Sequence, residues 1–478
     1  MQDILENLVF LTNDDLKKIH YATLDILEET GVRVDQEDAL KLLNDAGATV
    51  NFKERIVKIP HSLIEEVIKK AKRSVTLCGR NPKNDVKFGE GKVYVMTSST
   101  GLRVLDMDTG EVRMSTKKDV ADSARLADAL DNLHIYSIMV DALDCPDEIM
   151  TLEEIDAMFN NTEKHIDTGA QSTDITRDAI RMAAAVAGGF EELRKRPIID
   201  FMQNPVSPLI HDRGDTEAIL ECAKHEVPLI ILNMAQAGGT SPITVAGTVL
   251  TSNAEVLSGM LIAMLANPNV PLIYGTTSIV LNMSISPQPV FGLIESGLIS
   301  TANAQLAKYY DFPCVIGADF GEATGHSGER MWRLGTIHAM LLALAKVDVL
   351  YGPGLIEEAK TLSYEEMVIG NEVAGMILRG VRGVEVTEET LAKDLIHKVG
   401  PGGNFLSEKH TLEHLKKDFF IPELLDRKKT KNLMEGAREK AKEILATHQP
   451  EPLDKSVKEQ LRQIIKEAWK REQRKKEN

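Results

Sequence analysis

Cysteine, aromatic residues and long apolar runs are all scarce in this chain of 478 residues. Its four cysteines are Cys78, Cys145, Cys222 and Cys314. They lie far apart and form no C-x-x-C pair, so neither a disulfide framework nor a structural zinc site is expected. This use of cysteine predicts a reducing, cytoplasmic location. The acidic N-terminus lacks the basic region of a signal peptide, and every long apolar stretch is interrupted by polar residues, so we expect no transmembrane helix.

Basic residues are also fewer than acidic ones. Lysine and arginine total 56 against 72 aspartates and glutamates, which gives a formal net charge of -16. Such a balance argues against general binding to nucleic acids or to anionic membranes. A hydrophobic content of 43% is far too high for a disordered chain. The length allows two or three domains, or one large barrel with additions.

The N-terminal part divides into two segments. Residues 14–32, 36–46 and 60–72 carry apolar residues at helical spacing, with Gly31 and Gly47 as stops, so 1–75 is predicted as a helical segment. Residues 76–130 change to short β-branched runs, and LRVLDMDTGEVRM (102–114) predicts a hairpin. We therefore expect an extension that contains a β-hairpin before the main domain begins.

From about residue 131, short apolar runs alternate with helical patterns. The runs are 135–140, 165–170, 197–203, 228–236, 271–278, 313–320 and 347–354. Strand–helix alternation of this kind predicts parallel βα units, and seven of them favour a (β/α)8 barrel over 131–425, with 404–408 as the eighth strand. A doubly wound open sheet is the competing topology.

The last segment, 426–478, is predicted to form charged helices. Residues 455–478 hold nine Lys or Arg and four Asp or Glu, a net charge of +5. A solvated helix with one face on the body is the simpler interpretation, and a docking surface for an acidic partner or subunit is the other.

Ionisable and aromatic residues gather where the predicted strands end. Asp319, Glu322, His326 and Arg330 follow the apolar run PCVIG within twelve residues. Because barrel active sites form at the carboxyl ends of the strands, this cluster is the best local site candidate. The aromatic residues near strand ends or in the β segment include Tyr94, Tyr274, Phe291, Phe320 and Tyr351. Each alone is more often a core residue, but together they could attract a cation.

Five segments resemble the trimethylamine methyltransferase family of corrinoid-dependent methyltransferases, and the resemblance covers nearly the whole chain. They are VLDMDTGEVR (104–113), GGTSPITVAGTVLTSNAEVLSGMLIAML (238–265), IESGLISTANAQLAKYYDFPCVIGAD (294–319), VGPGGNFLSEKHT (399–411) and IPELLDR (421–427). The resemblance implies a (β/α) barrel that transfers a methyl group to cobalt(I). The corrinoid would be carried by a separate small protein, with no cofactor or metal on this chain. A homo-oligomer is also expected.

One segment departs from the pattern of the family. Members that act on trimethylamine carry pyrrolysine in a stretch resembling D-x-Q-A-G-pyrrolysine-E. The corresponding stretch here, EATGHSGE, runs from Glu322 to Glu329 and has Gly328 at the pyrrolysine position. The departure argues against trimethylamine as the substrate. A quaternary ammonium leaves as a neutral tertiary amine without a proton donor, so a site that orients and desolvates it is sufficient.

The branch of the family without pyrrolysine includes enzymes for glycine betaine, proline betaine, carnitine and γ-butyrobetaine. Glycine betaine, the smallest, is our first expectation. The aromatic residues named above would face its ammonium group, and Gly328 would leave room for it. The carboxylates expected to support catalysis are Asp319, Glu322 and Glu255, while His326 or Arg330 would bind the substrate carboxylate.

Two other classes of protein are kept as alternatives. The first is a betaine-binding or sensory protein that shares the aromatic residues but has lost catalysis. The second is a metal-dependent barrel hydrolase, because His410 and His414 stand four residues apart in HTLEH, a spacing that can bind zinc on a helix. No third ligand is evident from the sequence, and stoichiometric zinc in the purified protein would favour this class.

Overall fold

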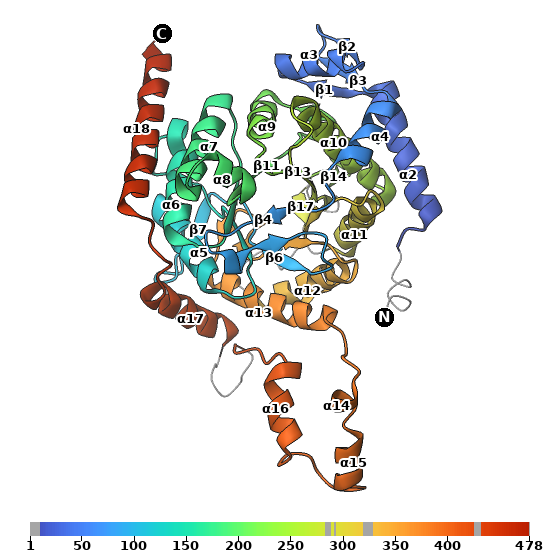
Figure 1. The fold of residues 1–478 in the computed structure, drawn as a ribbon, viewed down its shortest axis with the longest axis vertical. Coiled ribbons are helices and arrows are strands. Elements are labelled where there is room, and N and C mark those ends of the chain that lie inside the picture. The colour runs from blue at the N-terminus through green and yellow to red at the C-terminus, as the bar shows by residue number, and fades with distance from the viewer. Residues whose placement is uncertain (1–9, 283–287, 291–292, 319–327, 425–431, 478) are drawn as a thin grey trace.

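The computed structural model describes residues 10–282, 288–290, 293–318, 328–424 and 432–477, and its centre is a closed barrel of parallel strands (Figure 1). The barrel order is β10 (His165–Thr168), β11 (Ile199–Gln203), β13 (Leu229–Asn233), β15 (Leu272–Thr276), β18 (Cys314–Gly317), β19 (Val349–Tyr351), β6 (Tyr94–Met96) and β9 (Ile135–Ser137). Seven of these strands coincide with predicted runs. The (β/α)8 barrel is confirmed, and the open sheet is wrong.

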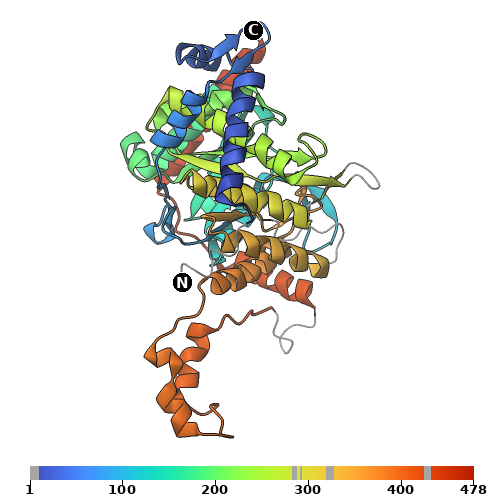
Figure 2. The same ribbon diagram turned by 90° about the vertical axis from the view of Figure 1, so that its right-hand side faces the viewer.

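Helices surround this barrel on the outside (Figures 1 and 2). In chain order they are α5 (Lys117–Ala129), α6 (Met150–Asn161), α7 (Thr173–Ala187), α8 (Phe190–Lys195), α9 (Arg213–His225), α10 (Val245–Ala266), α11 (Ile294–Tyr309), α12 (Gly328–Leu344) and α13 (Tyr364–Val381). Each of the crossovers between parallel strands contains at least one of them, as parallel pairing requires.

The predicted eighth strand is wrong. Residues 404–408 form no strand, and Leu406 is exposed. The barrel is closed instead by β6, which pairs in parallel with β19 on one edge and with β9 on the other. This strand lies in the segment that the sequence assigned to the extension, so the barrel begins earlier in the chain than residue 131. The sequence did not reveal this because β6 precedes the other seven strands and stands beside several short runs of similar composition.

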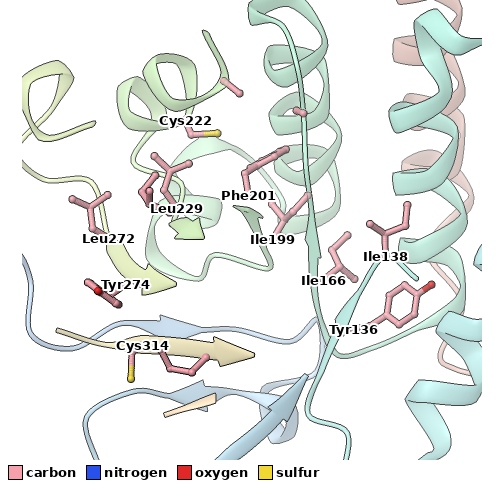
Figure 3. Close-up of a cluster of buried hydrophobic side chains, with 14 of the residues drawn as sticks. Tyr136, Ile138, Ile166, Ile199, Phe201, Cys222, Leu229, Leu272, Tyr274 and Cys314 are labelled. Atoms are coloured by element: carbon pink, nitrogen blue, oxygen red, sulfur yellow. The ribbon is translucent and has the colours of Figure 1, made fainter. Parts of the chain in front are cut away.

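Side chains alternate between two layers along each barrel strand. Outward-facing residues pack against the helices, as Figure 3 shows for Ile166, Phe201, Leu229 and Tyr274. Inward-facing residues such as Met96, Ile135, Ile230 and Val349 form a second cluster inside the barrel. This alternation follows from the two-residue period of a strand. The inner layer decides which side chains can reach a site on the barrel axis.

A small hairpin contributes to the inner cluster. It consists of β4 (Thr76–Leu77) and β5 (Val86–Lys87), which pair antiparallel. Leu77, Val86 and Phe88 are buried with the inward-facing strand residues. The Cys78 amide donates to the carbonyl of Pro197, just before β11, and the Gly89 amide donates to Asp348, just before β19. The hairpin therefore lies at the N-terminal end of the barrel, opposite the end where barrel enzymes bind substrates.

The first 75 residues are not purely helical. The expected helices are present as α2 (Asn13–Asp25), α3 (Glu37–Asp45) and α4 (His61–Lys70), with a π-helical turn η1 (Ile26–Thr30) before Gly31. Between them run β1 (Val32–Val34), β2 (Thr49–Asn51) and β3 (Ile56–Lys58), which form a sheet with β12 (Ile210–His211) of the barrel domain. The predicted hairpin is confirmed as β7 (Arg103–Leu105) and β8 (Val112–Met114).

Helix α10 is a core helix. Among the described helices it alone is long and apolar enough to cross a membrane, but 78% of its apolar window is buried inside the protein. Buried helices that are apolar on all sides are typical of the centre of a large domain.

The C-terminal part leaves the barrel and then returns to it. Residues 385–419 form an arm that projects away from the barrel and contains α14 (Glu388–Leu391), α15 (Lys393–Val399) and α16 (Lys409–Asp418) (Figures 1 and 2). The chain then forms α17 (Leu433–Thr447) and α18 (Lys455–Glu477), so the predicted charged helices are confirmed. Helix α18 packs against α7.

Candidate active site

A cavity of about 730 Å³ opens at the C-terminal ends of β9, β10 and β11. Eight carboxyl side chains line it: Asp141, Asp147, Glu148, Glu154, Asp167, Asp212, Asp215 and Glu472. Its described lining includes no lysine, arginine or histidine. A low-dielectric cleft lined by one sign of charge concentrates ligands of the opposite sign. The cavity is therefore suited to a cation.

Asp167 connects this cavity to a polar chain inside the barrel. Its Oδ2 accepts a hydrogen bond from the Ser137 hydroxyl on the neighbouring strand β9. On the other side its carboxyl hydrogen bonds to that of Asp200 on β11. Asp200 Oδ1 lies 2.7 Å from His165 Nε2, and His165 Nδ1 donates to the carbonyl of Cys78 at 3.0 Å. The chain runs from the cavity to the hairpin at the opposite end of the barrel.

The protonation states in this chain follow from its donors and acceptors. Burial lowers the pKa of His165 to about 4, so the ring is neutral and its one proton is on Nδ1, facing the Cys78 carbonyl. His165 Nε2 must then accept a hydrogen bond from the protonated carboxyl of Asp200, whose pKa burial raises to about 7. Burial and the neighbouring Asp200 raise the pKa of Asp167 well above its usual value. At pH 6 both carboxyl groups are therefore mostly protonated.

Other carboxyl groups of the cavity share this environment. Burial raises the pKa of Glu154 to about 8, although its Oε1 accepts from the Ala142 amide at 2.8 Å. Burial, with help from Asp212, raises the pKa of Asp215 to about 7, and Asp215 accepts from the Asn204 amide at 3.0 Å. The pKa of Asp141 is raised by burial as well. At pH 7 Glu154 is therefore mostly protonated, and Asp215 is protonated in part.

Helix α18 forms one edge of the cavity through Glu472. Its basic side chains pair with acidic residues of the body: Arg471 with Asp178 at 2.5 Å, and Lys475 with Asp174 at 2.9 Å. Lys476 also pairs with Glu148, another cavity residue. The positive end of the chain thus meets the acidic surface of its own barrel. These contacts support the simpler interpretation of the charged C-terminal helix.

Tyr351 is the predicted aromatic residue that lies at the right end of the barrel. It is the last residue of β19, faces the barrel interior and is 7% exposed. Its hydroxyl lies 2.7 Å from the Ser99 hydroxyl and accepts from the Ser99 amide at 3.0 Å. The ring lines a small cavity of about 30 Å³ together with Ser98, Ser278, Ser300 and His338. Asp167 is close enough to help raise the pKa of Tyr351. The predicted contact with substrate stays a prediction.

Glu255 has a different role from the predicted catalytic one. It lies on α10, is fully buried, and does not line the acidic cavity. Its oxygens accept from the Ser207 hydroxyl and the Leu209 amide, both at 2.8 Å, and from the Asn233 side chain. These donors belong to the loop after β11 and to the end of β13. Glu255 therefore holds the loop in place, and it has no free oxygen for a substrate.

Two predicted aromatic contacts lie elsewhere. Tyr94 starts β6 at the N-terminal end of the barrel, where its ring packs edge-on against His134. Tyr274 points outward into the helical layer (Figure 3), and its hydroxyl lies 3.2 Å from the side-chain oxygens of Asn253 and Asn303. Neither residue reaches the site, because only inward-facing residues near the C-terminal end of a strand do so. We therefore leave both out of the proposed site.

Several predicted residues lie outside the described part of the chain: Phe291, Asp319, Phe320, Glu322 and His326. Gly328 begins helix α12, directly after this undescribed segment, and Arg330 follows in the first turn. Their assigned contacts with the substrate remain predictions.

His410 and His414 lie on α16 in the projecting arm, away from the acidic cavity (Figure 1). Their rings stack 4.1 Å apart, and His414 pairs with Asp418 and Glu389. Within the described ranges, no group of three or more His, Cys, Asp or Glu side chains is arranged to hold a metal ion. This arrangement gives the hydrolase alternative no support.

Sequence reasoning missed the inner polar chain. His165, Asp167 and Asp200 stand inside the apolar runs HIDTGA and PIIDFMQ, and Asp167 and Asp200 are paired in the strand register. Charged residues inside a buried strand are costly unless they are paired or functional. That pattern was the available indication, and it lies within the strands instead of at their ends.

The comparisons with known proteins agree with this architecture. The sequence profile of the trimethylamine methyltransferase (MTTB) family matches residues 1–474. A trimethylamine methyltransferase, MttB, of Desulfitobacterium hafniense is 36% identical over 465 residues, covering 96% of this chain and 93% of that protein. A glycine betaine methyltransferase of another strain of D. hafniense is 31% identical over 479 residues, covering 98% of this chain and 99% of that protein.

A solved structure adds support for the fold alone. The monomethylamine methyltransferase (MtmB) of Methanosarcina barkeri superposes with a TM-score of 0.55 at 14% sequence identity, covering 91% of this chain and 88% of that chain. The closed parallel barrel, the match along almost the entire sequence and the full-length relatives lead to one conclusion. The chain belongs to the trimethylamine methyltransferase family.

Proposed function

We propose that this protein transfers one methyl group from a quaternary ammonium compound to cobalt(I) of a corrinoid carried by a partner protein. Glycine betaine is the first candidate, and proline betaine, carnitine and γ-butyrobetaine are the alternatives. The observation that carries the proposal is the cavity of eight carboxyl groups at the catalytic end of the barrel. Its carboxyl groups can supply the negative charge that a permanent cation needs, and the described lining itself contains no lysine, arginine or histidine, although Lys476 pairs with Glu148 at its edge.

For this reaction the protein needs only to bind the substrate and orient it. Cobalt(I) supplies the electron pair that forms the new cobalt–carbon bond. The carbon–nitrogen bond breaks, its electrons stay on nitrogen, and a neutral tertiary amine leaves. Because the nitrogen is already cationic, no proton has to be delivered to the leaving group. Alignment of the methyl carbon with cobalt, together with exclusion of water, supplies the rate enhancement.

One feature favours a quaternary ammonium over trimethylamine. By the resemblance described above, Gly328 falls at the position of pyrrolysine, and a glycine offers no group that could capture a tertiary amine. The relatives include both named activities, a trimethylamine methyltransferase at 36% identity and a glycine betaine methyltransferase at 31%. On this proposal Tyr351 faces the ammonium group from the barrel interior, and His326 or Arg330 binds the carboxylate. We keep the reducing cytoplasm as the proposed location, in line with four free cysteines.

The test mixes the protein with its reduced corrinoid partner and each candidate in turn. Formation of methylcobalt(III), followed in the visible spectrum, is expected with at least one betaine and not with trimethylamine. Tight betaine binding without any methylated spectrum would instead identify a binding protein. His326→Ala and Arg330→Ala are expected to raise the apparent substrate constant for betaines about tenfold, the loss of one charge-assisted contact. Tetramethylammonium, which has no carboxylate, should be unaffected by either substitution.

A further inference from the structure

We propose that Asp167 is the counter-charge for the ammonium group of the substrate, and that it exchanges its proton for the bound cation. This inference rests on the proposed function, because it takes the acidic cavity as the substrate site. It goes further in naming one carboxyl among eight and in predicting that substrate binding releases a proton.

The position of Asp167 distinguishes it from the other carboxyl groups. It lines the cavity and also faces the barrel interior, with 1% of its surface exposed. Its Oδ1 and the Oδ2 of Asp200 are buried, and no N–H or hydroxyl group donates to them. Two oxygens that face each other without a donor require a proton between them. A buried oxygen of this kind at a cavity wall is where a ligand cation can take over from a proton.

The hydrogen-bond chain requires two protons in the empty site. His165 Nδ1 donates to the Cys78 carbonyl, so its neutral ring accepts at Nε2 from Asp200. Asp200 then accepts from Asp167 at its second oxygen, and Asp167 accepts from Ser137. Each group of the chain then has a partner. The titratable groups facing Asp167 are Asp200 from β11, His165 from its own strand and Tyr351 from β19.

A bound cation changes this balance. A quaternary ammonium placed in the cavity without a counter-ion would be a buried, unpaired charge. Ionisation of Asp167 supplies the counter-ion, and its proton passes to solvent. The site is neutral before and after, since one positive charge leaves as another arrives. Below about pH 7 Asp200 keeps its proton, because it still donates to His165. The exchange also explains why a protein would hold a carboxyl in its neutral form next to a cation site.

Tetramethylammonium chloride is the probe, because it has no titratable group and needs no corrinoid partner to bind. Linkage makes the number of protons released equal to the slope of log affinity against pH. We expect close to one proton per bound cation at pH 6 in weakly buffered solution with a pH indicator. Affinity, measured by calorimetry, should rise about tenfold per pH unit until Asp167 is ionised in the free protein, and then level off.

Two isosteric variants distinguish the role of Asp167 from that of Asp200. In Asp167→Asn the amide can donate to Asp200 and its oxygen can accept from Ser137, so the fold should persist. This variant should release no proton and should bind the cation at least tenfold more weakly at pH 8. In Asp200→Asn the amide can donate to His165 and the oxygen can accept from Asp167. Proton release should then remain close to one.

Glu366→Gln is the matched control outside the cavity. Burial raises the pKa of Glu366 to about 8, but it lies on α13 and does not line the acidic cavity. Its replacement should leave the proton count unchanged. The inference is overturned if tetramethylammonium fails to bind, if it binds without proton release, or if Asp167→Asn still releases a full proton. None of these results would remove methyl transfer, which the spectral assay decides separately.

Discussion

Asp167 and Asp200 are register partners on adjacent strands β10 and β11, and their buried carboxyl groups interact inside the barrel. The strand register places two side chains that ordinarily repel each other side by side. They stay together because protons are retained there, and His165 and Ser137 accept or donate at the two ends. Of this pair, Asp167 also lines the acidic cavity.

Buried carboxyl groups with raised pKa make stability fall as pH rises. Burial and the neighbouring Glu365 raise the pKa of Glu366 to about 8, whereas its usual value is 4.5. Between these values the folded protein binds more protons than the unfolded chain, so the free energy of unfolding decreases with pH. Glu366→Gln should unfold like the parent near pH 4.5 and be more stable at pH 8, with a difference growing by up to about 1.4 kcal/mol per pH unit. Denaturant unfolding at several pH values measures it, and a constant difference would be contrary to the prediction.

Glu255→Ala should destabilise the protein strongly. The change leaves the Ser207 hydroxyl, the Leu209 amide and the Asn233 side chain without their acceptor. Buried donors without partners cost about 1–3 kcal/mol each, and relaxation of the loop recovers part of this, so a loss of about 2–4 kcal/mol is expected. Chemical denaturation provides the measurement. The exposed Glu388→Ala serves as the control and should shift stability by less than about 0.5 kcal/mol. A similar small effect from both changes would show that Glu255 does not hold the loop.

Tyr351→Phe and Tyr351→Ala should separate two roles of one side chain. The phenylalanine variant keeps the ring but loses the contacts of the hydroxyl with Ser99, which should reduce stability by about 1 kcal/mol. It should change the apparent substrate constant by less than about threefold. The alanine variant also removes the aromatic face, worth about 0.5–2 kcal/mol for a cation, and should raise that constant by about 2- to 30-fold. Equal constants in all three proteins would exclude Tyr351 from substrate binding.

The C-terminal helix should loosen when its ion pairs are removed. Arg471 and Lys475 pair with Asp178 and Asp174 on α7, in partly exposed positions. Such pairs contribute about 0.2–1 kcal/mol each and weaken with salt. The double change Arg471→Ala with Lys475→Ala should speed amide hydrogen exchange in α18 several-fold while the barrel strands stay protected. Lys466→Ala and Lys470→Ala on the same helix form the matched control. Unchanged exchange in α18 would mean that apolar packing alone holds the helix.

The sequence predicted the barrel well because seven strands are continuous apolar runs between amphipathic helices. It failed for β6 because this strand closes the barrel from far upstream in the chain, and only its pairing on both edges identifies it as a barrel strand. The small sheet among the N-terminal helices was missed for a similar reason, because β1, β2 and β3 have three residues each.

The candidate site was harder to predict. From composition alone, Tyr94, Tyr274 and Tyr351 are equally good candidates for the site. They differ in their place along the strand and in whether the side chain points into or out of the barrel. A shift of one residue along a strand reverses that direction. Only Tyr351 faces the interior at the catalytic end. The acidic cavity combines residues from 99 to 472, so no local motif contains it. The carboxylates nearest the barrel axis, Asp167 and Asp200, were hidden because each sits within an apolar run.

The most direct test of the account is the visible spectrum of the reduced corrinoid partner mixed with this protein and glycine betaine, proline betaine, carnitine or γ-butyrobetaine. The account predicts conversion of cobalt(I) to methylcobalt(III) with one of these betaines, together with release of the demethylated tertiary amine. Conversion with trimethylamine in preference to every betaine, or no conversion with any of them, would contradict it.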